Sequence, residues 1–195
     1  MLSLRQLKCL SIILSCLPSL AFASGGYDNG TPAGAGKIDI ELTLNPGDVV
    51  EKGQSYVVWG YGLTDKLDFH GYISHEAGGT DQIYYGLMYN FYHHSRLDLS
   101  TAIGIRHRRK LINVYVPQLL YTVRLAYGFD IIGSVVHVYD ADQDQGRGTT
   151  FDLALRIPIP KAFTPTFIKD AKLALGAFRS LGGNTYPTYS IDLRF

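Results

Sequence analysis

The stretch Tyr189-Ser190-Ile191-Asp192-Leu193-Arg194-Phe195 has an apolar or aromatic side chain at every second position and a polar one between. Successive side chains of an extended chain point to opposite faces, so this stretch has one apolar face and one polar face. Alternation of this kind predicts a β-strand that lies between an apolar environment and a polar one.

The same alternation recurs through most of the chain, and it is clear at 37–44, 67–76, 83–94, 97–106 and 151–157. Further segments have apolar residues on both faces but are rich in β-branched and aromatic residues, namely 56–63, 118–127 and 131–139. Adding 171–180 and 186–195 gives about ten strands, an even number, as in single-chain bacterial barrels. The sequence therefore predicts an all-β fold, an antiparallel up-and-down transmembrane β-barrel.

The connections between these segments fall into two classes. If the barrel starts in the periplasm, the turns on that side are short, at 64–66, 94–96 and 128–130. On the other side the connections are mostly longer and richer in Gly and charge, at 45–53, 77–82, 108–113, 140–148 and 181–185. Outer membrane barrels have this asymmetry. The long connection at 160–170, on the short side, has no explanation from the sequence.

Residues 1–23 are typical of a cleaved secretory signal peptide. Arg5 and Lys8 precede an apolar run, and Ala21-Phe22-Ala23 provides a small-x-small cleavage site. A lipoprotein signal ending at Cys16 is the alternative. The Gly-rich residues 24–36 are expected to form a flexible segment, which leaves 37–195 as the barrel domain.

Composition excludes several classes of function. Both cysteines lie in the leader, so disulfides do not stabilise the mature chain. The leader takes two of the 18 basic residues, and the remaining 16 against 17 acidic residues leave the mature chain near −1. This charge does not favour nucleic acid as a partner. Nothing after the leader resembles the roughly 18 apolar residues of a transmembrane helix.

Alternation alone does not show which face of the sheet contacts water. A soluble periplasmic lipocalin-like binding barrel would bury the apolar face, whereas a membrane barrel turns it to lipid. The polar face here mixes Gly, Ala, Ser and Tyr with charges of both signs, which suits a crowded lumen better than a solvated surface. The residues predicted to line that lumen are Asp39, Glu41, Asp68, His70, Glu76, Asp98, Arg106, Arg124, Asp152, Arg156, Asp192 and Arg194.

The last strand resembles the carboxy-terminal targeting signal of outer membrane β-barrel proteins, which alternates, ends in Phe and is read by the barrel insertion machinery. The residues that carry this membrane-insertion signal are Tyr189, Ile191, Leu193 and Phe195. Residues 61–68 likewise resemble the strand, tight turn and strand of such barrels. The resemblance is to small Gram-negative outer membrane barrels in general and covers 37–195. It implies outer membrane localisation, with outer membrane lipids and the insertion machinery as partners.

Two motifs are candidates for catalysis. His93-His94-Ser95 is similar to the His-x-Ser of outer membrane lipid A deacylases, in which a His base activates a Ser nucleophile, and by parity His93 and Ser95 share the lipid-facing side. No Glu follows at a suitable distance, so an interfacial turn is expected instead. Asp68 and His70 are superficially similar to the acid and His of omptin-type proteases, but Asp68 directly follows a periplasmic turn, so a lumen hydrogen bond is expected.

We expect no cofactor and no metal site, because neither His75-Glu76 nor the acidic segment 140–146 supplies a full ligand set. The sequence thus predicts an integral outer membrane barrel without enzymatic activity, either a surface or structural protein or a narrow pore, since about ten strands leave little free lumen. The alternatives are an outer membrane enzyme acting on lipid A or peptides, and the soluble binding barrel. The sequence does not identify a substrate or small-molecule ligand.

Overall fold

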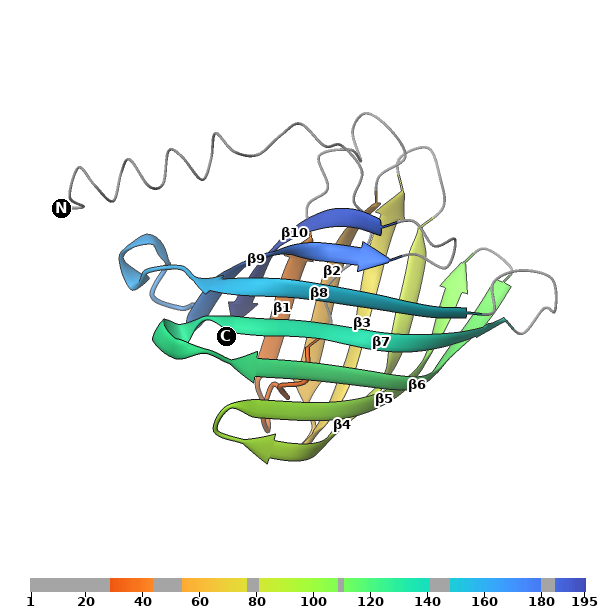
Figure 1. Ribbon diagram of the computed structural model, residues 1–195, viewed down its shortest axis with the longest axis horizontal. Helices are drawn as coiled ribbons and strands as arrows, with labels where there is room; N and C mark the ends of the chain where they lie inside the picture. Colours follow the sequence, from red (N-terminus) through yellow and green to blue (C-terminus); the bar gives the residue numbers. More distant parts are fainter. Residues whose placement is uncertain (1–28, 44–53, 77–80, 109–110, 141–147, 180–184) are drawn as a thin grey trace.

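The computed structural model describes residues 29–43, 54–76, 81–108, 111–140, 148–179 and 185–195. The predicted signal peptide, residues 1–23, lies outside this part of the chain. Within the described part there are ten strands (Figure 1). They are β1 (Ile38–Thr43), β2 (Gln54–Gly62), β3 (Leu67–Glu76), β4 (Gln82–His94), β5 (Leu97–Arg108), β6 (Leu111–Arg124), β7 (Asp130–Asp140), β8 (Gly148–Pro158), β9 (Asp170–Arg179) and β10 (Thr185–Arg194).

The strands form one closed barrel in which each pairs antiparallel with the next, and β1 pairs with β10 to close the circle. This confirms the predicted all-β, up-and-down barrel. The closing pair aligns Ile40 with Leu193 and Glu41 with Asp192, so the terminal alternating strand also seals the sheet. Closure gives every strand two neighbours and leaves no open edge of unpaired backbone groups.

Burial alternates along the strands with the period that the sequence predicts. In β8, odd-numbered residues from Phe151 to Leu155 are exposed and even-numbered residues from Thr150 to Arg156 are buried. Large apolar side chains are exposed on the outer wall, including Ile103 at 55% and Leu153 at 51%. The buried residues are mostly small, polar or charged. This arrangement is the reverse of a lipocalin-like barrel, which would pack those aliphatic side chains together inside.

Close packing inside the barrel depends on glycine at particular positions. Gly104 on β5 lies under the ring of Tyr84, and a Cβ added there would be 2.3 Å from the Tyr84 hydroxyl oxygen. Gly86 pairs directly with Gly104 across β4 and β5. The absence of a side chain at Gly104 makes room for the Tyr84 ring within the lumen, whereas a Cβ at Gly86 would lie 2.2 Å from the backbone carbonyl oxygen of Ile103.

The short-turn end of the barrel comprises the connections 63–66, 95–96, 125–129 and 159–169, and it lies on the left in Figure 1. The longest of them is the connection that the sequence does not explain. It contains the short 3-10 helix η3 (Lys161–Phe163) and a buried Ile168. The Lys169 amide donates to the Arg194 carbonyl oxygen over 2.8 Å, which ties this connection to the end of β10.

A second 3-10 turn, η2 (Ala126–Gly128), joins β6 to β7. Tyr127 and Gly128 both have positive φ in this turn. The described residues contain no helix that is both long and apolar enough to span a membrane.

Candidate functional site

The candidate site is the polar interior of the barrel. Of the residues predicted to line it, those with described side chains are all buried or half-buried: Asp39, Glu41, Asp68, His70, Asp98, Arg106, Arg124, Asp152, Arg156, Asp192 and Arg194. The side chain of Glu76 lies outside the described residues. The residues of the predicted insertion signal, Tyr189, Ile191, Leu193 and Phe195, are half-buried on or just beyond β10.

Arg156 on β8 is the centre of one cluster of charges. It is only 3% exposed, and its Nη2 atom lies 3.0 Å from Asp130 Oδ2. It also forms an ion pair with Asp192 on β10, and Lys172 on β9 contacts the same Asp130 carboxylate. A buried charge is tolerated when partners offset the cost of removing it from water. Four strands therefore supply one mutually neutralising network.

Smaller interactions balance other charges of the interior. Arg194 lies 3.0 Å from Asp39 across the seam between β10 and β1. Asp152 accepts hydrogen bonds from both the amide and the hydroxyl of Ser134. Arg106 lies over the ring of Tyr115, with its guanidinium carbon 5.2 Å from the ring centroid. These positive and negative side chains, which the sequence places inside the barrel, therefore each have a specific partner there.

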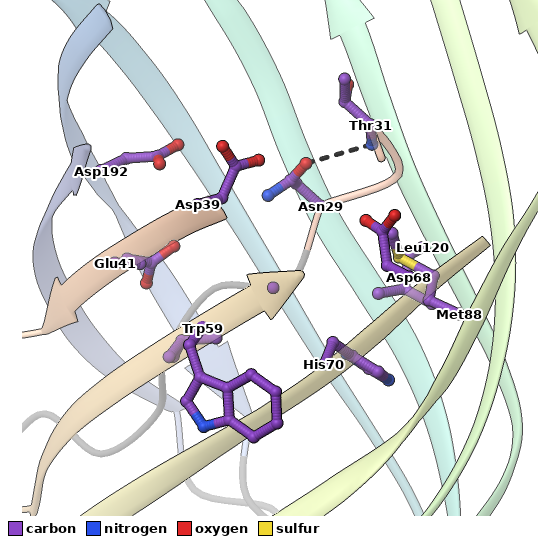
Figure 2. Close-up of a pocket in the computed structure, with 12 residues that line it drawn as sticks. Asn29, Thr31, Asp39, Glu41, Trp59, Asp68, His70, Met88, Leu120 and Asp192 are labelled. Carbon is purple, nitrogen blue, oxygen red and sulfur yellow. Dashed lines mark hydrogen bonds between the residues drawn. The ribbon is translucent and has the colours of Figure 1, made fainter. Parts of the chain in front are cut away.

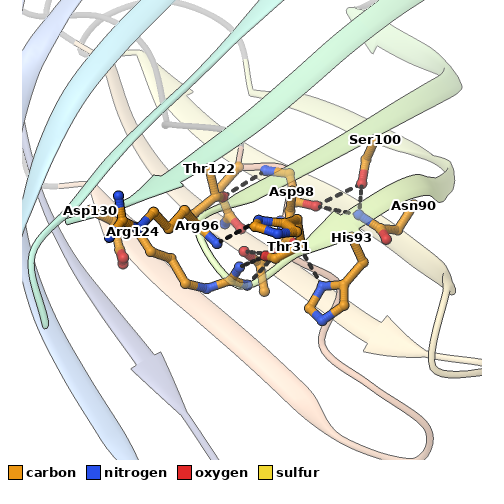
Figure 3. A network of polar contacts seen from close by, with 12 residues as sticks. Thr31, Asn90, His93, Arg96, Asp98, Ser100, Thr122, Arg124 and Asp130 are labelled. Atoms are coloured by element: carbon orange, nitrogen blue, oxygen red, sulfur yellow. Dashed lines mark hydrogen bonds and ion pairs between the residues drawn. The ribbon is translucent and has the colours of Figure 1, made fainter.

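Asp98 is the centre of the second cluster, close to the short-turn end (Figure 3). This residue is fully buried, and its carboxylate is in contact with His93 Nδ1 at 2.6 Å and with Arg124. Arg124 also donates to the His94 carbonyl oxygen. The cluster therefore fixes the β4–β5 turn against β6.

The candidate catalytic residues His93 and Ser95, for which the sequence favoured an interfacial turn, are not in contact in the described structure. Ser95 Oγ is in contact with His94 Nδ1 at 3.4 Å, and no contact joins it to His93 within the described residues. Parity places His93 on the lipid-facing side, but the β4–β5 register shifts by one residue between Asn90 and Tyr92. The bulge changes the direction of later side chains. His93 consequently contacts the interior Asp98.

Asp68 and His70 both form hydrogen bonds inside the lumen, as the sequence predicts, but no described contact joins them to each other. His70 Nε2 lies 3.1 Å from the Tyr84 hydroxyl, and Asp68 accepts a hydrogen bond from the Ala33 amide over 2.7 Å. Both side chains are buried. Each is therefore held in the interior by a different partner.

Residues 29–36, for which the sequence suggested flexibility, are hydrogen-bonded inside the barrel. The Gly30 amide donates to Thr122 Oγ1 over 3.0 Å, and its carbonyl oxygen accepts from Asn90 and Ser100. Thr31 donates to Asp98. At the other end the Gly36 amide donates to the Gly62 carbonyl oxygen. The segment thus crosses the lumen from the β1–β2 wall to the β5–β6 wall.

Gly30 allows this segment to reach the far wall. A Cβ at this position would be 2.8 Å from the carbonyl oxygens of Asp98 and Leu120. From the sequence alone, the glycines of 24–36 indicate a flexible segment. Glycine also permits close approach of two backbones, and that second property applies at this position.

Tyrosines fill the interior on the other side of His70. The rings of Tyr72, Tyr84 and Tyr115 stack with successive centroid distances of 5.2 Å, and Tyr56 contacts Tyr72 edge-on at 5.4 Å. Gln118 donates to the Tyr84 hydroxyl over 2.7 Å. The alternation in the sequence placed Tyr72 and Tyr84 on the inner face, but it did not indicate Tyr115 or the mutual stacking of the rings.

Between the amino-terminal segment and the tyrosines lies a cavity of about 50 Å³ (Figure 2). Its polar lining consists of Asn29, Thr31, Asp39, Glu41, Asp68, His70 and Asp192. A cavity of this volume can hold a few water-sized molecules, since each needs roughly 10–15 Å³. Among the described residues, no group of three or more His, Cys, Asp or Glu is arranged so that it could hold a metal ion.

Comparison with known proteins gives the following results. No protein-family model matches the sequence, and no curated protein matches it. Among solved structures, the chain is similar to a triple mutant of Rhodopseudomonas blastica porin, with a TM-score of 0.39 and 11% identity over 82% of this chain and 52% of the porin. Another mutant of that porin gives a TM-score of 0.38 and 11% identity over 81% and 51%. The chain spans about half the length of these porins.

Proposed function

We propose that this protein is an integral outer membrane β-barrel without enzymatic activity, and that its lumen is closed. The observation that carries the proposal is the orientation of the wall. Apolar side chains such as Ile103 and Leu153 are exposed outward, and paired charges such as Arg156 and Asp192 are buried within. A closed barrel is one of only two folds that satisfy the backbone inside lipid.

The sequence supports the same location. The signal peptide predicted at 1–23 provides export, and the alternating end at Tyr189, Ile191, Leu193 and Phe195 provides the signal for the insertion machinery. We place the short-turn end in the periplasm, because short periplasmic turns and longer external connections are usual in such barrels.

The contents of the lumen favour a surface or structural role over an open pore. The amino-terminal segment at 29–36 crosses the lumen near the short-turn end, and the stacked tyrosines occupy the adjoining part. Ten strands enclose an interior only slightly wider than side chains fill, so one added segment closes it.

An enzyme acting on lipid A or peptides is the weaker alternative. Asp98 orients His93 through Nδ1, but no Ser, Thr or Cys hydroxyl or thiol in the described residues hydrogen-bonds to His93. Nucleophilic catalysis needs that contact, or a close approach to it.

Fractionation of cells that express the full chain tests the location. We expect the processed protein in the outer membrane, with a folded form that migrates faster than the heat-denatured form on gels. Recovery in the soluble periplasmic extract would refute the proposal. In planar bilayers we expect no stable single-channel current, and a steady open-channel current would exclude the closed-lumen version.

A further inference from the structure

The cavity inside the lumen has an unequal distribution of charge. Its lining includes the four carboxylates of Asp39, Glu41, Asp68 and Asp192. Arg194 forms an ion pair with Asp39, and Arg156 forms one with Asp192. Asp68 forms no ion pair with any basic side chain of the described residues. The cavity is therefore bordered by a carboxylate whose charge is not offset by a direct ion pair.

Asp68 is also incompletely hydrogen-bonded. Its side chain points toward the cavity in Figure 2, and the residue is only 2% exposed. Oδ2 accepts the Ala33 amide hydrogen bond, whereas Oδ1 has no hydrogen-bond partner in the described structure. Leaving a buried carboxylate oxygen without a partner is costly, so a group that occupies the cavity would gain by satisfying it.

We propose that this cavity binds one small divalent cation, Mg²⁺ or Ca²⁺, with Asp68 as its direct protein ligand and water on its other sides. The negative lining selects a cation over an anion. The cavity volume of about 50 Å³ accommodates an ion with part of its hydration shell, but it is too small for an organic molecule. Mg²⁺ is commonly held by one or two carboxylates while it keeps several waters. Such a site does not need the cluster of direct ligands that the described residues lack.

The site joins the barrel wall to the amino-terminal segment. Asn29 and Thr31 of that segment line the cavity, and Ala33 holds the second oxygen of Asp68. A cation that binds only while the segment is docked stabilises the docked state by mass action. Cation binding is therefore expected to keep the lumen closed.

Titration calorimetry on the full exported chain, purified in detergent and stripped of metal, tests the site with MgCl₂ and then CaCl₂. We expect one saturable site per chain and an affinity at least about tenfold lower in Asp68→Asn, which keeps the shape but loses the charge. Asp152→Asn is the matched control. It removes a lumen carboxylate that is hydrogen-bonded to Ser134 and does not line the cavity, so its affinity should match the wild type.

A second measurement tests whether the ion binds in the cavity. Trp59 is the single tryptophan of the chain and belongs to the cavity lining. Tb³⁺ in the cavity should therefore give luminescence on tryptophan excitation, which Mg²⁺ or Ca²⁺ displaces and Asp68→Asn abolishes. Absence of saturable binding by the wild type, or equal binding by Asp68→Asn, would overturn the proposal.

The folding and the cellular location of each variant are measured separately from metal binding. Heat-dependent gel mobility of each variant shows whether the barrel is folded before the titration. A folded, membrane-inserted barrel that binds no cation contradicts this inference alone. A chain recovered as a soluble periplasmic protein contradicts the proposed membrane function, whatever its affinity for cations.

Discussion

Thr31 donates a hydrogen bond from Oγ1 to Asp98 Oδ2 over 2.8 Å, between residues 67 positions apart in the chain. One partner belongs to the amino-terminal segment and the other to the wall of the barrel. This contact, together with those of Gly30, holds the segment across the lumen. The docked position of the segment therefore depends on a few hydrogen bonds near the short-turn end.

Gly30→Val should open the lumen. The new Cβ would lie 2.8 Å from two backbone carbonyl oxygens of the far wall, so the segment cannot dock as it does in the wild type. We expect small single-channel currents in planar bilayers where the wild type gives none. Ala35→Ser is the control, because Ala35 is exposed. A silent Gly30→Val barrel that is folded would show that the segment does not close the pore.

Arg156→Ala should strongly destabilise the barrel. The substitution removes the ion pairs that Arg156 forms with Asp130 and Asp192, which are both buried. Breaking a buried ion pair by removing one partner typically costs about 3–5 kcal/mol. Denaturant unfolding of the reconstituted barrel measures this loss. The exposed Arg96 provides a control, since Arg96→Ala should change the free energy of unfolding by less than about 0.5 kcal/mol.

Gly104→Ala should be destabilising because of one neighbour. A methyl group there would overlap the ring of Tyr84, and overpacking of an interior costs about 1–3 kcal/mol. In a Tyr84→Ala background the same change should cost much less. A double-mutant cycle on unfolding free energies gives the coupling. Additive effects of the two substitutions would mean that the close approach is relieved in some other way.

Leu153→Arg tests directly whether the outer wall faces lipid, as proposed. Leu153 is exposed near the middle of β8, and a charge at the bilayer midplane costs roughly 2–4 kcal/mol in a membrane barrel. The expected result is a lower free energy of unfolding in liposomes. Phe163→Arg serves for comparison, because Phe163 is exposed in the connection between β8 and β9 and should tolerate the charge. Equal tolerance at both positions would contradict the membrane orientation of the wall.

Much of the barrel was predictable because its strongest signal is local. Alternation over a few residues, as at 151–157 or 189–195, determines which side chains share a face, and it needs no knowledge of distant partners. The same period identified the charged residues that turn inward, including Asp98 and Arg156. Their pairing was not predictable, since Asp98 meets Arg124 and Arg156 meets Asp192 only when the sheet closes.

Some features run against the local pattern. Parity assigns His93 to the outer face, but the bulge near Phe91 turns it toward an interior partner, Asp98. Composition alone did not reveal where the bulge occurs. Likewise, Gly30 is one of several glycines in the amino-terminal segment, and only its distance to the far wall distinguishes it.

The sequence by itself determined most of the strands, their approximate number and the apolar outer face, because a period of two is a property of neighbouring residues. In the structure β6 begins at Leu111, whereas the sequence predicted a strand from 118. Only the tertiary structure decided what fills the lumen. The amino-terminal segment, the stacked tyrosines and the cavity beside Asp68 are formed by residues from several strands, and their positions depend on closure of the barrel rather than on any one stretch of chain.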